Sequence, residues 1–195
     1  MLNIYDYLKI NDIFKIAEKY NVRDIISHEA KVKSFAGRIY DVLNEEHHLM
    51  RSHRNLLSCS AILHDIGCFI NKSSHQCHTK YIILQEKNFQ IVPYKLKQSL
   101  SVVAGSHGKM MDGDIDLYDM VEKKELLKLI AILRISDALD HTHKLNTCVE
   151  NISLEDSCLN IYIKSNNFRK IFLKVNDKSL LFEEMFSMKV RLKTM

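Results

Sequence analysis

The stretch LLSCSAILHDIGCFI, residues 56–70, decides how this chain folds. Wound as a helix, it is apolar on nearly every side, which is typical of a central helix that other helices cover. Near its middle, however, it carries the polar pair His64 and Asp65, followed by Gly67. A buried carboxylate without a partner costs several kcal/mol or changes its pKa until it is neutral. The stretch therefore predicts a helical core in which a partner compensates the polar pair.

Helical patterns lie on both sides of this stretch. Apolar residues recur at helical spacing over residues 24–43, 74–85, 96–106 and 121–139. Asp24 or Ser27 can cap the first of these helices and Ser74 the second. One Pro and five Gly in the whole chain leave long uninterrupted stretches. The small number of these helix-breaking residues favours a mainly α fold.

The apolar period changes from 3.6 to 2 after residue 146. Apolar and polar residues alternate over residues 159–163 and again over residues 171–175, which predicts two strands. Asp177 can cap a short helix, and alternation over residues 188–192 predicts a last strand. We therefore expect a helical domain over residues 1–146 and a small α+β appendage, strand–strand–helix–strand, over residues 147–195 that packs on it.

Composition bounds the function. With 195 residues, 46% hydrophobic and 27% charged, the chain has enough apolar volume for a real core, which excludes a disordered scaffold. A net charge of +4 falls short of a nucleic-acid footprint. Five cysteines without a CxxC pair predict neither disulfides nor a cysteine zinc site. No run approaches a membrane span. We expect a cytoplasmic protein without membrane contact.

Several ionisable residues fall on the apolar faces of these helices. One such residue by itself is more often a hydrogen-bonded core residue than a ligand. Together, their imidazole nitrogens and carboxylate oxygens are satisfied most simply by a divalent metal ion. The residues are His28, His64, Asp65, His78, His107 and Asp137.

The segment AILHDIG, residues 61–67, resembles the HD superfamily of metal-dependent phosphohydrolases, whose core is an HD-domain, phosphodiesterase-like helical fold. The segments HQCHTKYI (75–82), LRISDALD (133–140) and LFEEMF (181–186) resemble the C-terminal HD domain of the exopolyphosphatase/guanosine pentaphosphatase (Ppx/GppA) family. In that family polyphosphate hydrolysis resides in N-terminal ATPase-type domains. This chain has too few residues and glycines for those domains, and resembles the HD domain alone.

The resemblance implies one or two divalent ions, among Mn, Fe, Ni, Co, Zn and Mg. It assigns one ion to His28, His64, Asp65 and Asp137, and a second to His78 and His107 with Asp65 as the bridge. It thus implies a metal-dependent phosphohydrolase that attacks a nucleotide or other phosphate ester through a metal-activated water. Candidates for binding phosphate oxygens or protonating the leaving group lie near the ligands in sequence: Lys109, Arg134, His75 and His143.

Other interpretations remain open. The chain could be a non-catalytic HD module that binds a phosphorylated nucleotide or polyphosphate, compatible with a homodimer. Nucleic-acid binding is the weakest of these interpretations. Hydrolysis of stringent-response nucleotides is disfavoured because residues 67–74, which follow the His-Asp pair, contain no acidic residue. Asp140 is expected to orient a ligand or to cap its helix. His47, His48 and His53 are expected to face solvent, and Cys59, Cys68 and Cys77 to act as small buried apolar residues.

Overall fold

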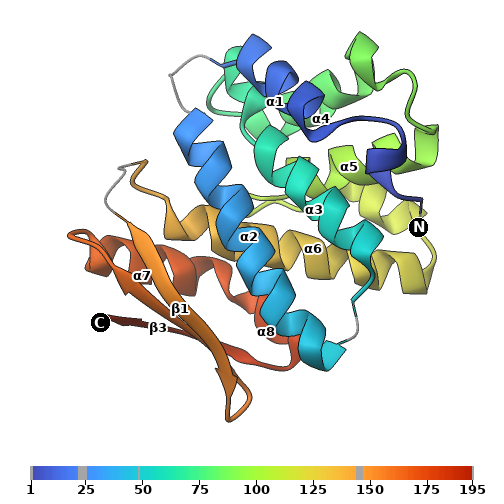
Figure 1. Ribbon diagram of the computed structural model, residues 1–195. Coiled ribbons are helices and arrows are strands. Elements are labelled where there is room, and N and C mark those ends of the chain that lie inside the picture. Colours follow the sequence, from blue (N-terminus) through green and yellow to red (C-terminus); the bar gives the residue numbers. More distant parts are fainter. Residues whose placement is uncertain (1, 22–25, 48, 144–146, 195) are drawn as a thin grey trace.

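The computed structural model describes residues 2–21, 26–47, 49–143 and 147–194, apart from the side chains of residues 26 and 27. It is mainly α-helical with a small C-terminal sheet, which confirms the predicted fold class (Figure 1). The helices are α1 (Ile10–Lys19), α2 (Ile26–His47), α3 (Arg51–Leu63), α4 (His75–Gln85), α5 (Tyr94–Gly105), α6 (Met120–Leu139), α7 (Phe168–Lys178) and α8 (Leu180–Phe186). The strands are β1 (Cys148–Glu155), β2 (Cys158–Lys164) and β3 (Lys189–Thr194).

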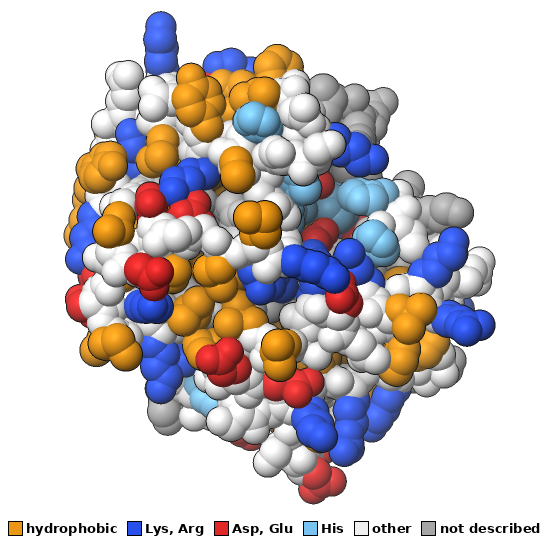
Figure 2. Space-filling view, turned by 180° about the vertical axis from the view of Figure 1, so that it is seen from behind, with side chains coloured by type: hydrophobic (Ala, Val, Ile, Leu, Met, Phe, Trp, Pro, Cys, Tyr) orange, Lys and Arg blue, Asp and Glu red, His pale blue; other side chains and the backbone are white. Residues whose placement is uncertain are grey.

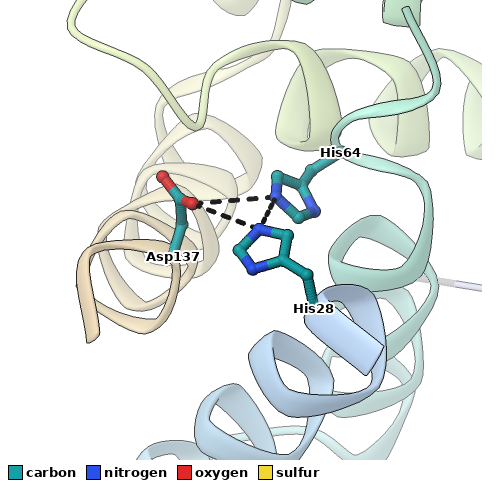
Figure 3. Close-up of side chains that lie close together, drawn as sticks. All are labelled: His28, His64 and Asp137. Carbon is teal, nitrogen blue, oxygen red and sulfur yellow. Dashed lines mark hydrogen bonds and ion pairs between the residues drawn. The ribbon is translucent and has the colours of Figure 1, made fainter. Parts of the chain in front are cut away.

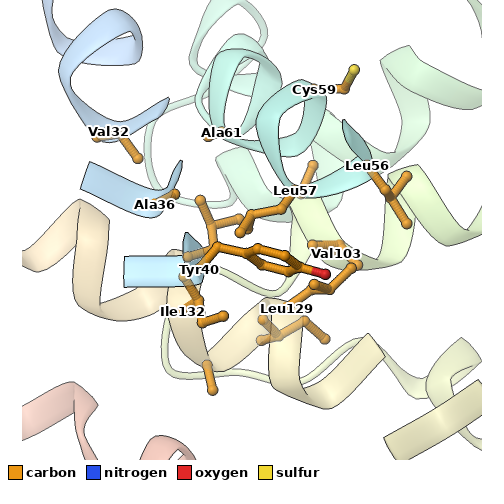
Figure 4. Close-up of a cluster of buried hydrophobic side chains, with 14 of the residues drawn as sticks. Val32, Ala36, Tyr40, Leu56, Leu57, Cys59, Ala61, Val103, Leu129 and Ile132 are labelled. Carbon is orange, nitrogen blue, oxygen red and sulfur yellow. The ribbon is translucent and has the colours of Figure 1, made fainter. Parts of the chain in front are cut away.

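Helix α3 is the centre of the helical body. It contacts α1, α2, α5 and α6, and every residue from 55 to 64 is buried. Tyr40, Leu57, Val103 and Leu129 meet beside it in one apolar cluster (Figure 4). Burying one such large apolar side chain stabilises a fold by about 1.5–3 kcal/mol. The burial of the apolar residues between 56 and 63 therefore fixes the position of the end of α3.

The helix expected over residues 56–70 is divided in the structure. Helix α3 ends at Leu63, and the short 3-10 helix η2 (Ile66–Phe69) follows after His64 and Asp65. The first long helix starts at Ile26, so Ser27 lies inside it, while Asp24 lies outside the described residues. Ser74 is the residue before α4, but its side chain makes no capping hydrogen bond.

The C-terminal segment forms a three-stranded sheet in the order β1-β2-β3. Strands β1 and β2 pair antiparallel, while β2 and β3 pair parallel. Parallel neighbours need a crossover connection, and α7 with α8 provides it. These two helices contact both β3 and α6, and β1 contacts α2, so the segment packs on the helical body through α6 and α2.

The strand expected over residues 171–175 is wrong, because these residues lie in α7. Ile171 and Val175 are fully buried, but Leu173 between them is 59% exposed. Residues four apart share one face of a helix as well as one face of a strand. The exposure of Leu173 therefore distinguishes a helix from a strand, which the spacing of the apolar residues alone could not do.

Two expectations about polar and sulfur side chains also fail. His53 is buried rather than solvated, and its Nδ1 lies 3.4 Å from a carboxylate oxygen of Glu125. His47 is half-buried, with its ring edge-on to Phe186, and His48 lies outside the described residues. Cys59 is buried as expected, but Cys68 is half-buried and Cys77 exposed. Among the described helices, none is both long and apolar enough to cross a membrane.

Candidate metal centre

Six donor side chains from separate parts of the chain meet at the end of α3. His64 and Asp65 directly follow α3, and His107 follows α5. His28 lies in the first turn of α2, His75 in the first turn of α4, and Asp137 in the last turn of α6. In the part of the chain that the structure describes, these six side chains therefore lie close together.

The first donor group contains His28, His64 and Asp137 (Figure 3). The Nε2 atoms of the two imidazoles are 3.2 Å apart. Asp137 Oδ1 lies 3.6 Å from Nε2 of His28 and 3.8 Å from Nε2 of His64. The three side chains point toward one another from three different helical segments, α2, α6 and the end of α3.

The second donor group lies on the other side of Asp65. Asp65 Oδ1 is 3.4 Å from Nε2 of His75 and 3.4 Å from Nε2 of His107. These two nitrogens are 2.9 Å apart. The same carboxylate also approaches the first group, with Oδ1 3.7 Å from His64 Nε2 and Oδ2 4.0 Å from His28 Nε2. Asp65 therefore lies between the two donor groups.

All four imidazoles are anchored through Nδ1. Nδ1 of His64, His107 and His75 lies 2.9, 2.7 and 2.9 Å from the backbone carbonyl oxygens of Ala61, Ala104 and Lys72. A carbonyl oxygen only accepts, so each Nδ1 carries a proton, and in the neutral form of such a ring the lone pair lies at Nε2. The fourth ring, His28, is held through Nδ1 by the buried carboxylate of Asp140 at 2.8 Å.

When both rings of a pair are neutral, their Nε2 lone pairs face each other, at 3.2 Å in the first group and 2.9 Å in the second. Two facing lone pairs repel unless a proton or another cation lies between them. Donors about 2.1 Å from a shared ion lie about 3.0 Å apart in octahedral and about 3.4 Å apart in tetrahedral geometry. The nitrogen–nitrogen separations and the Asp65 separations of the second group are close to these values, and the Asp137 separations of the first group, 3.6 and 3.8 Å, are slightly longer. The residues present therefore fit divalent metal ions.

The local charges also favour a cation. Burial alone would raise the pKa of Asp137, but Lys178 and the two imidazoles of its group outweigh burial and hold it well below its usual range. Burial likewise opposes ionisation of Asp65, and His64 and His107 lower its pKa nevertheless. Burial would lower the pKa of His28, yet the neighbouring carboxylates raise it to about 10. The centre thus keeps two ionised carboxylates that attract positive charge.

Gly67 explains why α4 reaches this centre. A Cβ at this position would lie 1.9 Å from the carbonyl oxygen of His75 and 2.4 Å from the backbone nitrogen of Thr79. The Gly67 N–H donates to Thr79 Oγ1 at 3.0 Å, and that hydroxyl donates to the His64 carbonyl at 2.8 Å. Only a residue without a side chain allows the first turn of α4 to approach so closely.

As a result, His75 rather than His78 stands beside Asp65. His78 lies one helical turn later, is half-buried, and belongs to neither donor group among the described residues. The two histidines are three residues apart on α4, and the one in its first turn lies beside Asp65. His75, expected as a catalytic group, lies in the second donor group, 3.4 Å from Asp65 Oδ1.

The other expected catalytic residues differ in their contacts. Arg134 is buried and donates to the carbonyl oxygens of Ser106 at 2.8 Å and Met110 at 3.1 Å, so it holds the loop that carries His107. Lys109 is exposed and pairs with Asp177 at 2.8 Å. The ring of His143 lies over His28, with ring centroids 4.1 Å apart.

A cavity of about 390 Å³ opens in front of the centre, where the space-filling view shows imidazoles and carboxylates in a hollow with cationic side chains beside it (Figure 2). Donors from both groups line it, together with His141, His143 and four lysines. The lysines are Lys72, Lys109, Lys174 and Lys178. A cavity of this volume is within the range of small-molecule sites, about 300–1,000 Å³.

Lys178 is a site residue that the sequence interpretation missed. It is buried at the end of α7, and its Nζ donates to the carbonyl oxygen of His107 at 3.0 Å and to Oδ2 of Asp137. A signal was present, because Lys178 follows Ile171 and Val175 at i+7 and i+3. A lysine that continues an apolar helical stripe is aimed inward like the histidines.

The structure is thus a mainly helical fold whose His and Asp groups could hold a metal ion. A model of the family described as Ppx/GppA phosphatase, domain III, matches residues 9–184 of the chain. The chain therefore belongs to this phosphatase-related family, which confirms the Ppx/GppA part of the resemblance. A search of curated proteins finds no match.

Proposed function

We propose that this chain is a divalent-metal-dependent phosphohydrolase of the HD type, which acts on a nucleotide or another small phosphate ester. The observation that carries the proposal is the shared position of Asp65 between two pairs of Nε2 atoms, 3.2 and 2.9 Å apart. Bound divalent ions would act as Lewis acids toward a phosphoryl oxygen and would make water a stronger nucleophile at neutral pH. His75 replaces His78 in the proposed ligand set.

The residues around the ligands have separate tasks in this proposal. Asp140 fixes His28 with Nε2 facing inward, as a carboxylate behind a ligating histidine does. Lys178 lies against one oxygen of Asp137 and leaves the other for the donor group. Its buried ammonium at the cavity wall is placed to attract non-bridging phosphate oxygens. Arg134 acts as a positioning residue for the loop of His107.

The cavity supports a phosphorylated substrate. Lys72, Lys109 and Lys174 add positive charge to its wall, and charge-assisted hydrogen bonds to phosphate are stronger than neutral ones. Lys109 must leave Asp177 to reach a phosphate, since the two are paired at 2.8 Å. A nucleotide is the proposed class because the cavity of about 390 Å³ has room beyond one phosphate group.

The test combines metal content with turnover. Elemental analysis of chain purified without a histidine tag should give up to two divalent ions, and Asp65→Ala should lose metal and phosphate release together while keeping its helical circular dichroism. His53→Gln is the matched control. His53 is also buried, but it precedes His64 by eleven residues, about 16 Å along a helix. It should keep both properties.

Two outcomes would overturn the proposal. Full metal content in Asp65→Ala would refute the ligand assignment. Metal-loaded chain that binds nucleoside phosphates but releases no phosphate from nucleoside mono-, di- and triphosphates or p-nitrophenyl phosphate would refute catalysis. That second result would favour the regulatory binding module instead.

A further inference from the structure

Cys68 stands next to the second donor group. We propose that its thiolate is a ligand of that group, and that the two metal positions therefore differ in kind. The second position would take a borderline ion such as Zn²⁺ or Co²⁺ in preference to Mg²⁺ or Mn²⁺. This inference rests on the metal centre of the proposed function, but not on hydrolysis.

The local backbone brings Cys68 to Asp65. Asp65 is the residue before the 3-10 helix η2, and Cys68 follows it by three residues. Side chains at i and i+3 of a 3-10 helix lie one above the other, and the Cys68 N–H donates to the Asp65 carbonyl at 2.9 Å. Sγ of Cys68, a carboxylate oxygen of Asp65 and a ring nitrogen of His75 all lie within 4.8 Å of one another.

Cys68 also faces the correct space. It is half-buried and lines the same cavity as His75, His107 and Asp65. The other cysteines lie elsewhere: Cys59 is enclosed in the core, where burial raises the pKa of its thiol, and Cys77 is exposed on α4. Among the described residues, none of the other cysteines belongs to a donor group.

The donor types distinguish the two positions. The first group offers imidazole nitrogens with a carboxylate oxygen. The second offers two imidazoles and the shared carboxylate of Asp65, with the thiol of Cys68 within 4.8 Å of donor atoms of Asp65 and His75. A metal ion deprotonates a coordinating thiol, and thiolates select softer ions over Mg²⁺ and Mn²⁺. Asp65 belongs to both sets, so replacing it cannot separate them, but replacing Cys68 can.

The experiment uses the full chain loaded with Co²⁺. We expect a thiolate-to-cobalt charge-transfer band in the near ultraviolet for the unmodified chain and for the control Cys77→Ser, and its loss in Cys68→Ser with helical circular dichroism unchanged. As a second measurement on the unmodified chain, Zn²⁺ should protect Cys68 from alkylation, as detected by peptide mass spectrometry, whereas Mg²⁺ should not.

The outcomes separate this inference from the proposed function. Visible cobalt d–d bands without a charge-transfer band, or a charge-transfer band that survives in Cys68→Ser, would overturn the role of Cys68 alone. Failure to bind Co²⁺ at all would overturn the metal centre and this inference together. A lack of phosphate release would leave the cobalt spectrum unaffected and would count only against hydrolysis.

Discussion

Gly67→Ala provides the sharpest test of how the fold builds the centre. The added methyl group would lie 1.9 Å from the His75 carbonyl oxygen and 2.4 Å from the Thr79 nitrogen, and neither backbone atom can rotate away. Helix α4 must move outward, which also weakens the 3.0 Å hydrogen bond from the Gly67 N–H to Thr79. Overpacking costs about 1–3 kcal/mol and a lost hydrogen bond about 1 kcal/mol, so we expect a loss of about 2–4 kcal/mol.

Urea unfolding followed by circular dichroism measures this loss, and elemental analysis measures its effect on the centre. Because His75 moves with α4, Gly67→Ala should also hold less metal than the unmodified chain. Gly113→Ala is the matched control, since a Cβ there meets nothing within 4 Å. Its stability should stay within about 0.5 kcal/mol of the unmodified chain or rise slightly. If Gly67→Ala is as stable as Gly113→Ala and keeps all its metal, the account of α4 is refuted.

Three further predictions concern single side chains. Asp140→Asn should weaken metal binding about 10–100-fold in chelator competition, because the anchor of His28 Nδ1 loses its charge; unchanged affinity would contradict this role. Lys178→Met should lower kcat by about 10²-fold with little change in metal content; an unchanged kcat would remove Lys178 from phosphate binding. Burial lowers the pKa of His53 in the folded state below the unfolded value of about 6.5. The stability that the neutral, buried ring contributes is therefore present above pH about 6.5 and is lost as the pH falls toward the folded-state pKa. His53→Gln should therefore show a flatter decline of unfolding free energy below pH about 6.5 than the unmodified chain in urea titrations, and an equal or steeper decline would count against burial of a neutral ring.

The sequence predicts the helical core because its central stretch leaves little choice. Residues 56–63 are apolar on nearly every side, which favours a position covered by other helices, and the structure buries every one. The same argument applies to His64, His107 and Asp137, since each continues an apolar series that must face inward. One-sided burial can thus be predicted for residues on long helices.

Sequence and structure differ where the local sequence does not determine which turn of a helix meets the site, or whether a segment is a helix or a strand. His75 and His78 share a face of α4, and only the close contact at Gly67 decides that the first turn meets Asp65. In α7, the apolar pair Ile171 and Val175 fits both a helix and a strand. Each decision depends on a tertiary contact between segments that lie apart in the sequence, which no local pattern contains.

Because the sequence pattern predicted a strand where α7 lies, it also missed the contribution of the C-terminal segment to the site. The change of period near residue 146 divides the chain into two patterns, but the cavity is lined from both sides of it. Lys178 connects the end of α7 to Asp137 on α6 and to the loop of His107. Without this ammonium, the ionised carboxylate of Asp137 would lose the cation that contributes most to its low pKa. The C-terminal segment therefore belongs to the electrostatics of the centre as well as to its outer wall, and removing it would alter the centre even if the helices before it stayed folded.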